Sequence, residues 1–274
     1  MEWFEAIILG LIQGLTEFLP VSSSGHLVIG KEILGIEASD DLVFEVTVHA
    51  ATVLSTILVF RKQIWSLLKG LFKFKYNDET DYILKICVSM IPVFIVGMFF
   101  KDYVESLFGS LYSVAGALVV TALLLFFSDM ASRPGRTSAV VPQKEYRNGI
   151  SWWQAFVVGI GQALAVAPGL SRSGTTISTG LICGVRRDVM AQFSFLMVLV
   201  PILGEAFLEV VGGEMASSSI GFLPLALGFI SAFVSGFLAC KAMIALVRKA
   251  SLKWFALYCI IVAVALFVTL GIRA

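Results

Sequence analysis

Apolar residues form long stretches along the chain, and short polar segments separate them. A helix needs about 20 apolar residues to cross a hydrocarbon core of roughly 30 Å. Six stretches meet or approach this length, and they lie at residues 42–60, 82–100, 111–128, 190–211, 222–242 and 255–272. The pattern therefore predicts an all-α polytopic membrane protein with six transmembrane helices.

Two further apolar segments are interrupted by polar residues, glycine and proline. Residues 6–34 are broken at 16–26, and residues 153–185 are broken at 167–176. Each flank of the first break is about ten residues long, which at about 1.5 Å per residue spans roughly half the membrane. Backbone that is not helical at that depth must be buried in protein or line a watery cavity. We therefore expect two re-entrant helix–loop–helix segments.

The distribution of Lys and Arg tests this arrangement, because cytoplasmic loops carry the excess of these residues. If both broken segments are re-entrant, most basic residues, including Arg186 and Arg187, fall on one side of the membrane. The other side then holds Lys31, Lys101 and Arg273. We therefore expect both termini outside, with the first re-entrant segment entering from outside and the second from the cytoplasm. A site built on the first segment is expected to open outward.

The two broken segments resemble each other at a spacing of 149 residues. The paired positions include Gly10 and Gly159, Gln13 and Gln162, Leu15 and Leu164, Ser22 and Ser171, Ser24 and Ser173, and Gly25 and Gly174. Each half then has one re-entrant segment and three crossings, an odd number, so the halves must have opposite orientations. Many transporters build a substrate site where the broken helices of such inverted repeats meet. We predict one membrane domain, 1–274, with inverted repeats at approximately 1–128 and 150–274, a cytoplasmic loop at 129–149, and two polar loops that face each other.

Composition narrows the classes of function. Hydrophobic residues make up 58% of the chain and charged residues 14%, with a mean hydropathy of +0.92, whereas soluble domains carry about 25% charged residues. The formal net charge is +1, so no basic or acidic bias suggests nucleic acid as a partner. Ionisable residues inside a membrane are costly and indicate a functional site by default.

The first polar loop places several reactive side chains close together. Gln13 and Glu17 are four residues apart and therefore share one helical face. The residues that follow are Ser22, Ser23, Ser24, Gly25 and His26. In the alternative interpretation, Glu17 caps a neighbouring loop, His26 is a satisfied core histidine, and the serines serve helix capping and packing.

The second polar loop resembles an oxyanion site. Arg172 is flanked by hydroxyl-bearing and small residues just before a helix is expected to begin. Free N–H groups at a helix start attract phosphate, and Arg binds phosphate with two parallel hydrogen bonds. The alternative is a structural ion pair between Arg172 and Glu17, which is compatible with an anion site.

Together the two loops offer what hydrolysis of a phosphate anhydride needs. Arg172 would hold the anion, Glu17 a divalent cation, and His26 with Ser23 would supply nucleophilic or acid–base chemistry. The candidate phosphate contacts are Ser22, Ser24, Gly25, Ser171, Ser173, Gly174 and Thr176. Glu45 and His49 lie one helical turn apart in the next span, where they are candidates to line the same cavity or, for Glu45, to face water.

A rival hypothesis comes from the inverted repeat itself. Carriers are commonly built this way, so a transporter or flippase for an anionic lipid is the alternative function. A carrier needs no nucleophile, and this requirement separates the two hypotheses.

Two long motifs carry a resemblance to a known family. They are Gln13-x-x-x-Glu17-Phe18-Leu19-Pro20-Val21-Ser22-Ser23-Ser24-Gly25-His26 and Pro168-Gly169-Leu170-Ser171-Arg172-Ser173-Gly174-x-Thr176. They resemble the two signatures of the undecaprenyl-diphosphate phosphatase family, the integral-membrane type linked to bacitracin resistance. The likeness covers essentially the whole chain.

This resemblance implies a function in the bacterial plasma (inner) membrane. The enzyme would remove the terminal phosphate of C55 polyprenyl diphosphate and so recycle the carrier lipid for peptidoglycan synthesis, with Mg²⁺ or Ca²⁺. By motif match, Glu17 serves the metal, Arg172 the phosphates, and His26 and Ser23 the nucleophile and base, in an order left open. Members often carry Glu at the position of Gln13, which weakens the case for Gln13 as a direct metal ligand. A homodimer is compatible with the sequence.

Overall fold

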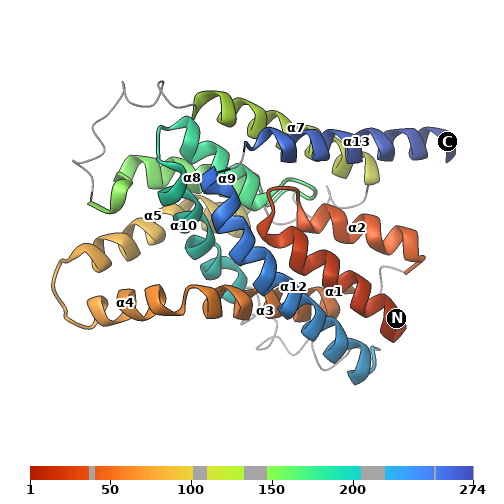
Figure 1. Cartoon of the computed structure of the whole chain (residues 1–274), viewed down its shortest axis with the longest axis horizontal. Coiled ribbons are helices and arrows are strands. Elements are labelled where there is room, and N and C mark those ends of the chain that lie inside the picture. Colours follow the sequence, from red (N-terminus) through yellow and green to blue (C-terminus); the bar gives the residue numbers. More distant parts are fainter. Residues whose placement is uncertain (37–40, 101–109, 133–146, 205–219, 250, 274) are drawn as a thin grey trace.

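Helices make up the fold in the part of the chain that the computed structural model describes, which comprises residues 1–36, 41–100, 110–132, 147–204, 220–249 and 251–273. No strand occurs among these residues. Figure 1 shows the helices, whose bounds are α1 Trp3–Phe18, α2 Ser23–Leu34, α3 Asp41–Val59, α4 Arg61–Leu71, α5 Asp78–Phe99, α7 Leu111–Ala131, the short η5 Arg147–Gly149, α8 Trp152–Leu164, α9 Arg172–Ile182, α10 Arg187–Met197, α12 Phe222–Lys249 and α13 Lys253–Arg273.

Five helical stretches in the described part of the chain are long and apolar enough to cross a membrane. They cover Asp78–Phe99, Leu111–Ala131, Arg187–Gly204, Phe222–Val247 and Lys253–Ile272. A sixth candidate joins Val43–Val59 to Arg61–Leu71 across a bend of 77°. These helices coincide with the six predicted stretches and confirm an all-α, multi-pass membrane protein. The end of the predicted stretch 190–211 lies outside the described residues.

Each of the two broken segments folds back on itself as a pair of packed helices, α1 with α2 and α8 with α9. Gly30 of α2 faces Leu9 and Ile12 of α1. Gln154 at the start of α8 donates a hydrogen bond from Nε2 to the carbonyl of Cys183, the residue after α9, at 2.9 Å. The chain therefore returns towards the level at which each segment began, and the depth of the two segments in a membrane stays a prediction.

The breaks in these segments differ from the predicted ones, because each following helix begins immediately after a capping serine. The first break covers residues 19–22 rather than 16–26, and the second covers 165–171 rather than 167–176. Polar residues at the edges of the predicted breaks are therefore helical. Glu17 is the last residue but one of α1.

Each half of the sequence supplies the packing partner for the hairpin of the other half. Helix α1 packs against α12, and α8 packs against α5. Glycine allows the close approach in both places: a Cβ on Gly10 would lie 2.4 Å from the carbonyl oxygen of Gly228, and a Cβ on Gly159 would lie 2.3 Å from that of Ser89. Small residues at such crossings let membrane helices pack closely. The inverted orientation of the halves stays a prediction.

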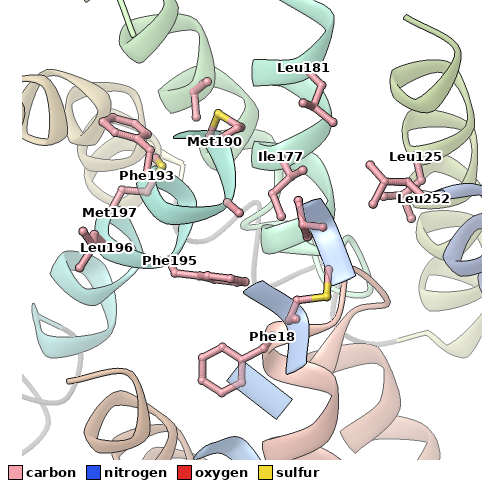
Figure 2. Packing of buried hydrophobic residues seen from close by; sticks show 14 of the residues in the cluster. Phe18, Leu125, Ile177, Leu181, Met190, Phe193, Phe195, Leu196, Met197 and Leu252 are labelled. Carbon is pink, nitrogen blue, oxygen red and sulfur yellow. The ribbon is translucent and has the colours of Figure 1, made fainter. Parts of the chain in front are cut away.

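The larger buried apolar cluster includes residues at the end of α1 and on α9, the helices that flank the two turns (Figure 2). Phe18, the last residue of α1, is 2% exposed and packs edge-to-face on Phe195 of α10 with 5.9 Å between ring centroids. Ile177 and Leu181 of α9 belong to the same cluster. Because apolar transfer adds little between helices in lipid, van der Waals packing of this kind holds the helices in register. One buried cluster therefore packs helices next to both turns against each other.

Candidate functional site

The first turn, between α1 and α2, ends in a serine cap. Ser22 has a φ of 73°, and its Oγ accepts a hydrogen bond from the N–H of Gly25 at 3.1 Å. The same Oγ lies 3.4 Å from Oγ of Ser24. A serine oxygen in this position satisfies one of the N–H groups that a helix start leaves free. Ser22 therefore caps α2. This agrees with the alternative in which the serines serve helix capping rather than phosphate binding.

The second turn, between α8 and α9, repeats this arrangement. Oγ of Ser171 accepts from the N–H of Gly174 at 3.0 Å and lies 3.4 Å from Oγ of Ser173. Ser173 also donates to the carbonyl of Leu19, in the first turn, at 3.1 Å. This contact confirms the prediction that the two polar loops face each other.

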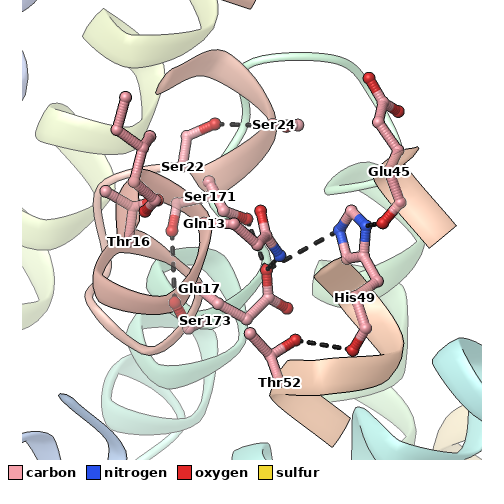
Figure 3. A network of polar contacts seen from close by, with 12 residues as sticks. Gln13, Thr16, Glu17, Ser22, Ser24, Glu45, His49, Thr52, Ser171 and Ser173 are labelled. Carbon is pink, nitrogen blue, oxygen red and sulfur yellow. Dashed lines mark hydrogen bonds and ion pairs between the residues drawn. The ribbon is translucent and has the colours of Figure 1, made fainter. Parts of the chain in front are cut away.

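Glu17 is the centre of the polar contacts (Figure 3). Its side chain is 7% exposed, and its Oε2 accepts hydrogen bonds from Oγ of Ser23 at 2.6 Å and from Nε2 of Gln13 at 2.9 Å. Nε2 of His49 lies 3.9 Å from the same oxygen. Three helices, α1, α2 and α3, therefore converge on one carboxylate oxygen.

His26 lies apart from this group. Its Nδ1 is 2.7 Å from the carbonyl oxygen of Ser22, and its Nε2 is 2.8 Å from Oη of Tyr258 on α13, with the two rings stacked. The predicted partnership of His26 with Ser23 is therefore not formed among the described residues. Tyr258 was not predicted, because a single tyrosine in an apolar span has no motif that marks it.

Arg172, the first residue of α9, borders a cleft together with Glu17. The cleft is small, with about 20 Å³ available to the centre of a water-sized molecule. Within the described chain the guanidinium of Arg172 makes no hydrogen bond, and no carboxylate lies within 4 Å of it, although it acts electrostatically on Glu17. The ion pair with Glu17 is therefore not formed at contact distance. The remaining polar side chains that border the cleft are Thr52, Thr56, Gln162, Ser173, Thr176 and Ser194.

Two of the predicted phosphate contacts thus border the cleft, Ser173 and Thr176. Thr176 is 1% exposed, and its Oγ1 lies 2.7 Å from Oγ of Ser194 on α10. The carboxylate of Glu45 is bound to Nζ of Lys31 at 2.5 Å and its side chain is 37% exposed, as in the alternative in which Glu45 faces water. His49 is the member of that pair that reaches Glu17.

Gln162 is a site residue that the sequence analysis did not single out. It is 2% exposed, and its Oε1 has no hydrogen-bond partner within the described chain. The same holds for Oε1 of Gln13, which is fully buried. An unpaired buried carbonyl is costly and calls for a specific explanation, such as an ion or a ligand. The spacing of 149 residues, which pairs Gln13 with Gln162, was the signal that could have identified it.

Carboxylate and amide oxygens at Glu17 and Gln13 are of the kind that hard divalent cations prefer. The described residues contain no group of three or more His, Cys, Asp or Glu side chains placed to hold a metal ion. Any cation at Glu17 would therefore take ligands from amides, water or phosphate as well.

Comparison with known proteins identifies the family of this chain. A family model described as "Bacitracin resistance protein BacA" matches residues 6–265, which include both turns. The chain belongs to this family. A protein of Bacteroides fragilis named undecaprenyl-diphosphatase is 53% identical over 268 residues, covering 96% of this chain and 97% of that protein. Proteins with the same name from Bacteroides thetaiotaomicron and Halothermothrix orenii are 51% identical (98% of this chain, 99% of that protein) and 37% identical (99% and 100%), each over 273 residues. The BacA family assignment confirms the resemblance found in the two motifs.

Proposed function

We propose that this protein hydrolyses undecaprenyl (C55) diphosphate to undecaprenyl monophosphate and inorganic phosphate. Family membership and the names of its relatives support this activity. The observation that carries it is the guanidinium of Arg172, which borders the same cleft as Glu17 without a hydrogen bond to the described chain. A partly buried cation with free donors is arranged to bind an anion.

Arg172 and the start of α9 would hold the diphosphate. The guanidinium can bind two phosphate oxygens at once, and the helix start adds partial positive charge. Hydroxyls of Ser173 and Thr176 border the same cleft. The prenyl chain would remain in the bilayer, since each buried CH₂ stabilises that position by about 0.8 kcal/mol. Only the head group of the lipid needs to reach the turns.

Ser23 is the nucleophile that the geometry favours. Its hydroxyl donates to Glu17 at 2.6 Å, so the carboxylate is placed to accept the proton as Oγ attacks the terminal phosphorus. The bond from that phosphorus to the bridging oxygen breaks, and the lipid monophosphate leaves. Water then cleaves the phosphoserine, inorganic phosphate departs, and Glu17 returns the proton to Ser23. Both ring nitrogens of His26 are occupied by Ser22 and Tyr258, so a nucleophilic His26 is disfavoured.

A divalent cation, Mg²⁺ or Ca²⁺, fits the proposal, with Glu17 and the unpaired oxygen of Gln13 as its protein ligands. Such a cation neutralises charge on the phosphate oxygens when it is bound.

The location of the protein is a further part of the proposal. We place it in the bacterial plasma (inner) membrane, with both termini outside, inverted repeats and a cleft open to the outside. The positive-inside distribution of Lys and Arg supports this orientation. A cysteine at position 23 should react with a membrane-impermeant thiol reagent added from outside, and reaction from the cytoplasmic side alone would contradict the orientation.

Phosphate release by the purified protein tests the activity. The wild-type protein should release phosphate from long-chain polyprenyl diphosphate in the presence of Mg²⁺ or Ca²⁺. Ser23→Ala should abolish the release, because it removes the attacking hydroxyl. Ser24→Ala is the matched control, since Oγ of Ser24 contacts Ser22 rather than Glu17, and it should retain most of the activity. Equal activity in both variants would contradict the assignment of Ser23.

A lipid carrier is the second candidate, favoured by the reciprocal packing of α1 on α12 and α8 on α5. Transfer of a labelled polyprenyl diphosphate between leaflets by Ser23→Ala, without phosphate release by the wild type, would favour the carrier.

A further inference from the structure

His49 is the second histidine of the chain, and it faces the proposed cation site from α3 (Figure 3). Its Nδ1 lies 2.8 Å from the carbonyl oxygen of Glu45, and its Nε2 lies 3.9 Å from Oε2 of Glu17. The hydroxyl of Thr52 donates to the carbonyl of His49 at 2.8 Å. The imidazole is therefore held at a defined position beside the carboxylate.

The contact with Glu45 fixes which ring nitrogen of His49 carries hydrogen. A carbonyl oxygen accepts only, so Nδ1 must be the donor, and Nε2 of a neutral ring then carries a lone pair. That lone pair faces a carboxylate oxygen, which is also an acceptor. A positive species between the two acceptors, either a proton or a metal ion, would stabilise this arrangement.

The distance between these two atoms favours a metal ion. A direct N–H···O hydrogen bond spans about 2.7–3.2 Å, and the observed separation is 3.9 Å. Two ligand atoms that each lie about 2.0–2.2 Å from one ion can be as much as about 4 Å apart. The separation between Nε2 of His49 and Oε2 of Glu17 therefore exceeds a hydrogen bond and lies within the upper limit for two ligands of one ion.

The surroundings of His49 also favour its role as a metal ligand. Metal-binding histidines almost always donate their second ring N–H to a carbonyl or carboxylate, as His49 does to Glu45. Gln13, fully buried, donates from Nε2 to the same carboxylate, and its Oε1 is unpaired within the described chain. Glu17 and Gln13 on α1 and His49 on α3 thus offer a carboxylate oxygen, an amide oxygen and an imidazole nitrogen as ligands.

We propose that Nε2 of His49 is a further ligand of the divalent cation at Glu17, so that this protein has a mixed nitrogen–oxygen site. Imidazole suits Fe²⁺, Ni²⁺ and Zn²⁺ better than Mg²⁺ or Ca²⁺, and Mn²⁺, which accepts the oxygen ligands of such a site, serves as its paramagnetic probe. Three protein ligands leave coordination positions for phosphate oxygens, as in catalytic metal sites. The inference rests on the proposed cation site and does not depend on the phosphatase reaction.

Pulsed electron paramagnetic resonance of bound Mn²⁺ tests the proposal. The protein is prepared without a tag, and with two histidines in the chain a ¹⁴N coupling from imidazole can come from His26 or His49. The coupling should be present in the wild type and in His26→Gln and absent in His49→Gln. The Kd for Mn²⁺ should rise at least about tenfold in His49→Gln, and Glu17→Gln should remove the binding.

The measurement is made without lipid. A negative result for the metal site can therefore be distinguished from a lack of phosphatase activity. Mn²⁺ bound without ¹⁴N coupling, coupling that persists in His49→Gln, or no binding of Mn²⁺ would each overturn the inference. Circular dichroism during heating checks that His49→Gln unfolds at the wild-type temperature, because Gln keeps a donor for the carbonyl of Glu45. If the coupling is found and no phosphate is released from lipid, the metal site stands and the phosphatase proposal fails.

Discussion

Replacement of Arg172 separates a functional arginine from a structural one. Its guanidinium makes no hydrogen bond within the described chain, so Arg172→Ala leaves no buried partner unsatisfied. A bound phosphate would lose two charge-assisted hydrogen bonds, each worth about 1.5–3 kcal/mol. The sum of roughly 3–6 kcal/mol predicts that kcat/KM falls by about 10²–10⁴-fold. Arg172→Lys keeps the charge and one bond, and it should lose about 10–10²-fold.

Arg187→Ala is the matched control for this prediction. Arg187 pairs with Asp129 at 2.7 Å, and Asp129 is 5% exposed. Loss of this pair costs roughly 1–3 kcal/mol of folding stability, although Ser251 and Leu252 still donate to the carboxylate.

Two assays separate the outcomes, phosphate release from polyprenyl diphosphate and thermal unfolding followed by circular dichroism. Arg172→Ala should lose activity and unfold within a few degrees of the wild type, since about 1 kcal/mol corresponds to roughly 2–4 °C. Arg187→Ala should unfold at a lower temperature and retain activity while it is folded. Unchanged phosphate release by Arg172→Ala would refute the reasoning, as would a loss of stability equal to that of Arg187→Ala.

Two further predictions concern contacts that the structure places near the turns. Tyr258→Phe keeps the ring stacked on His26 but removes one hydrogen bond of about 1 kcal/mol, so the unfolding temperature should fall by roughly 2–4 °C, while Tyr112→Phe, in the same pair of helices, should show no change. Gly159→Leu should lower the unfolding temperature, because a Cβ there meets a backbone oxygen of α5 at 2.3 Å, whereas Gly97→Leu has open space and should not. In either pair, a larger effect of the control variant, Tyr112→Phe or Gly97→Leu, would contradict these contacts.

The spans were predictable because a bilayer imposes the length and apolarity of each crossing. The directions of the helices were not predictable, and the bend of 77° between α3 and α4, after Val59, is the clearest case. Hydropathy marks where the apolar stretch ends, next to Arg61, but the course of α4 depends on contacts with α5 that a single sequence does not record.

The site was predictable to the extent that local chemistry reveals it. The serine, glycine and proline residues of the two turns are short-range signals, and their repetition at a fixed spacing indicated that Ser173 and Leu19 would come from loops that meet. The partners of the histidines depend on tertiary contacts. The stacking of His26 on Tyr258 has no local signal, and the spacing of Glu45 and His49 marked His49 as a cavity candidate without identifying Glu17 as its partner.

The central claim is that a phosphate is cleaved from the end of a lipid diphosphate at this site. Hydrolysis of undecaprenyl diphosphate by the purified protein in ¹⁸O-labelled water, with mass spectrometry of both products, tests it most directly. Attack at the terminal phosphorus predicts that the ¹⁸O enters inorganic phosphate, that the lipid monophosphate stays unlabelled, and that Ser23→Ala gives neither product. Label in the lipid monophosphate, or recovery of intact diphosphate from the wild-type reaction, would contradict the account.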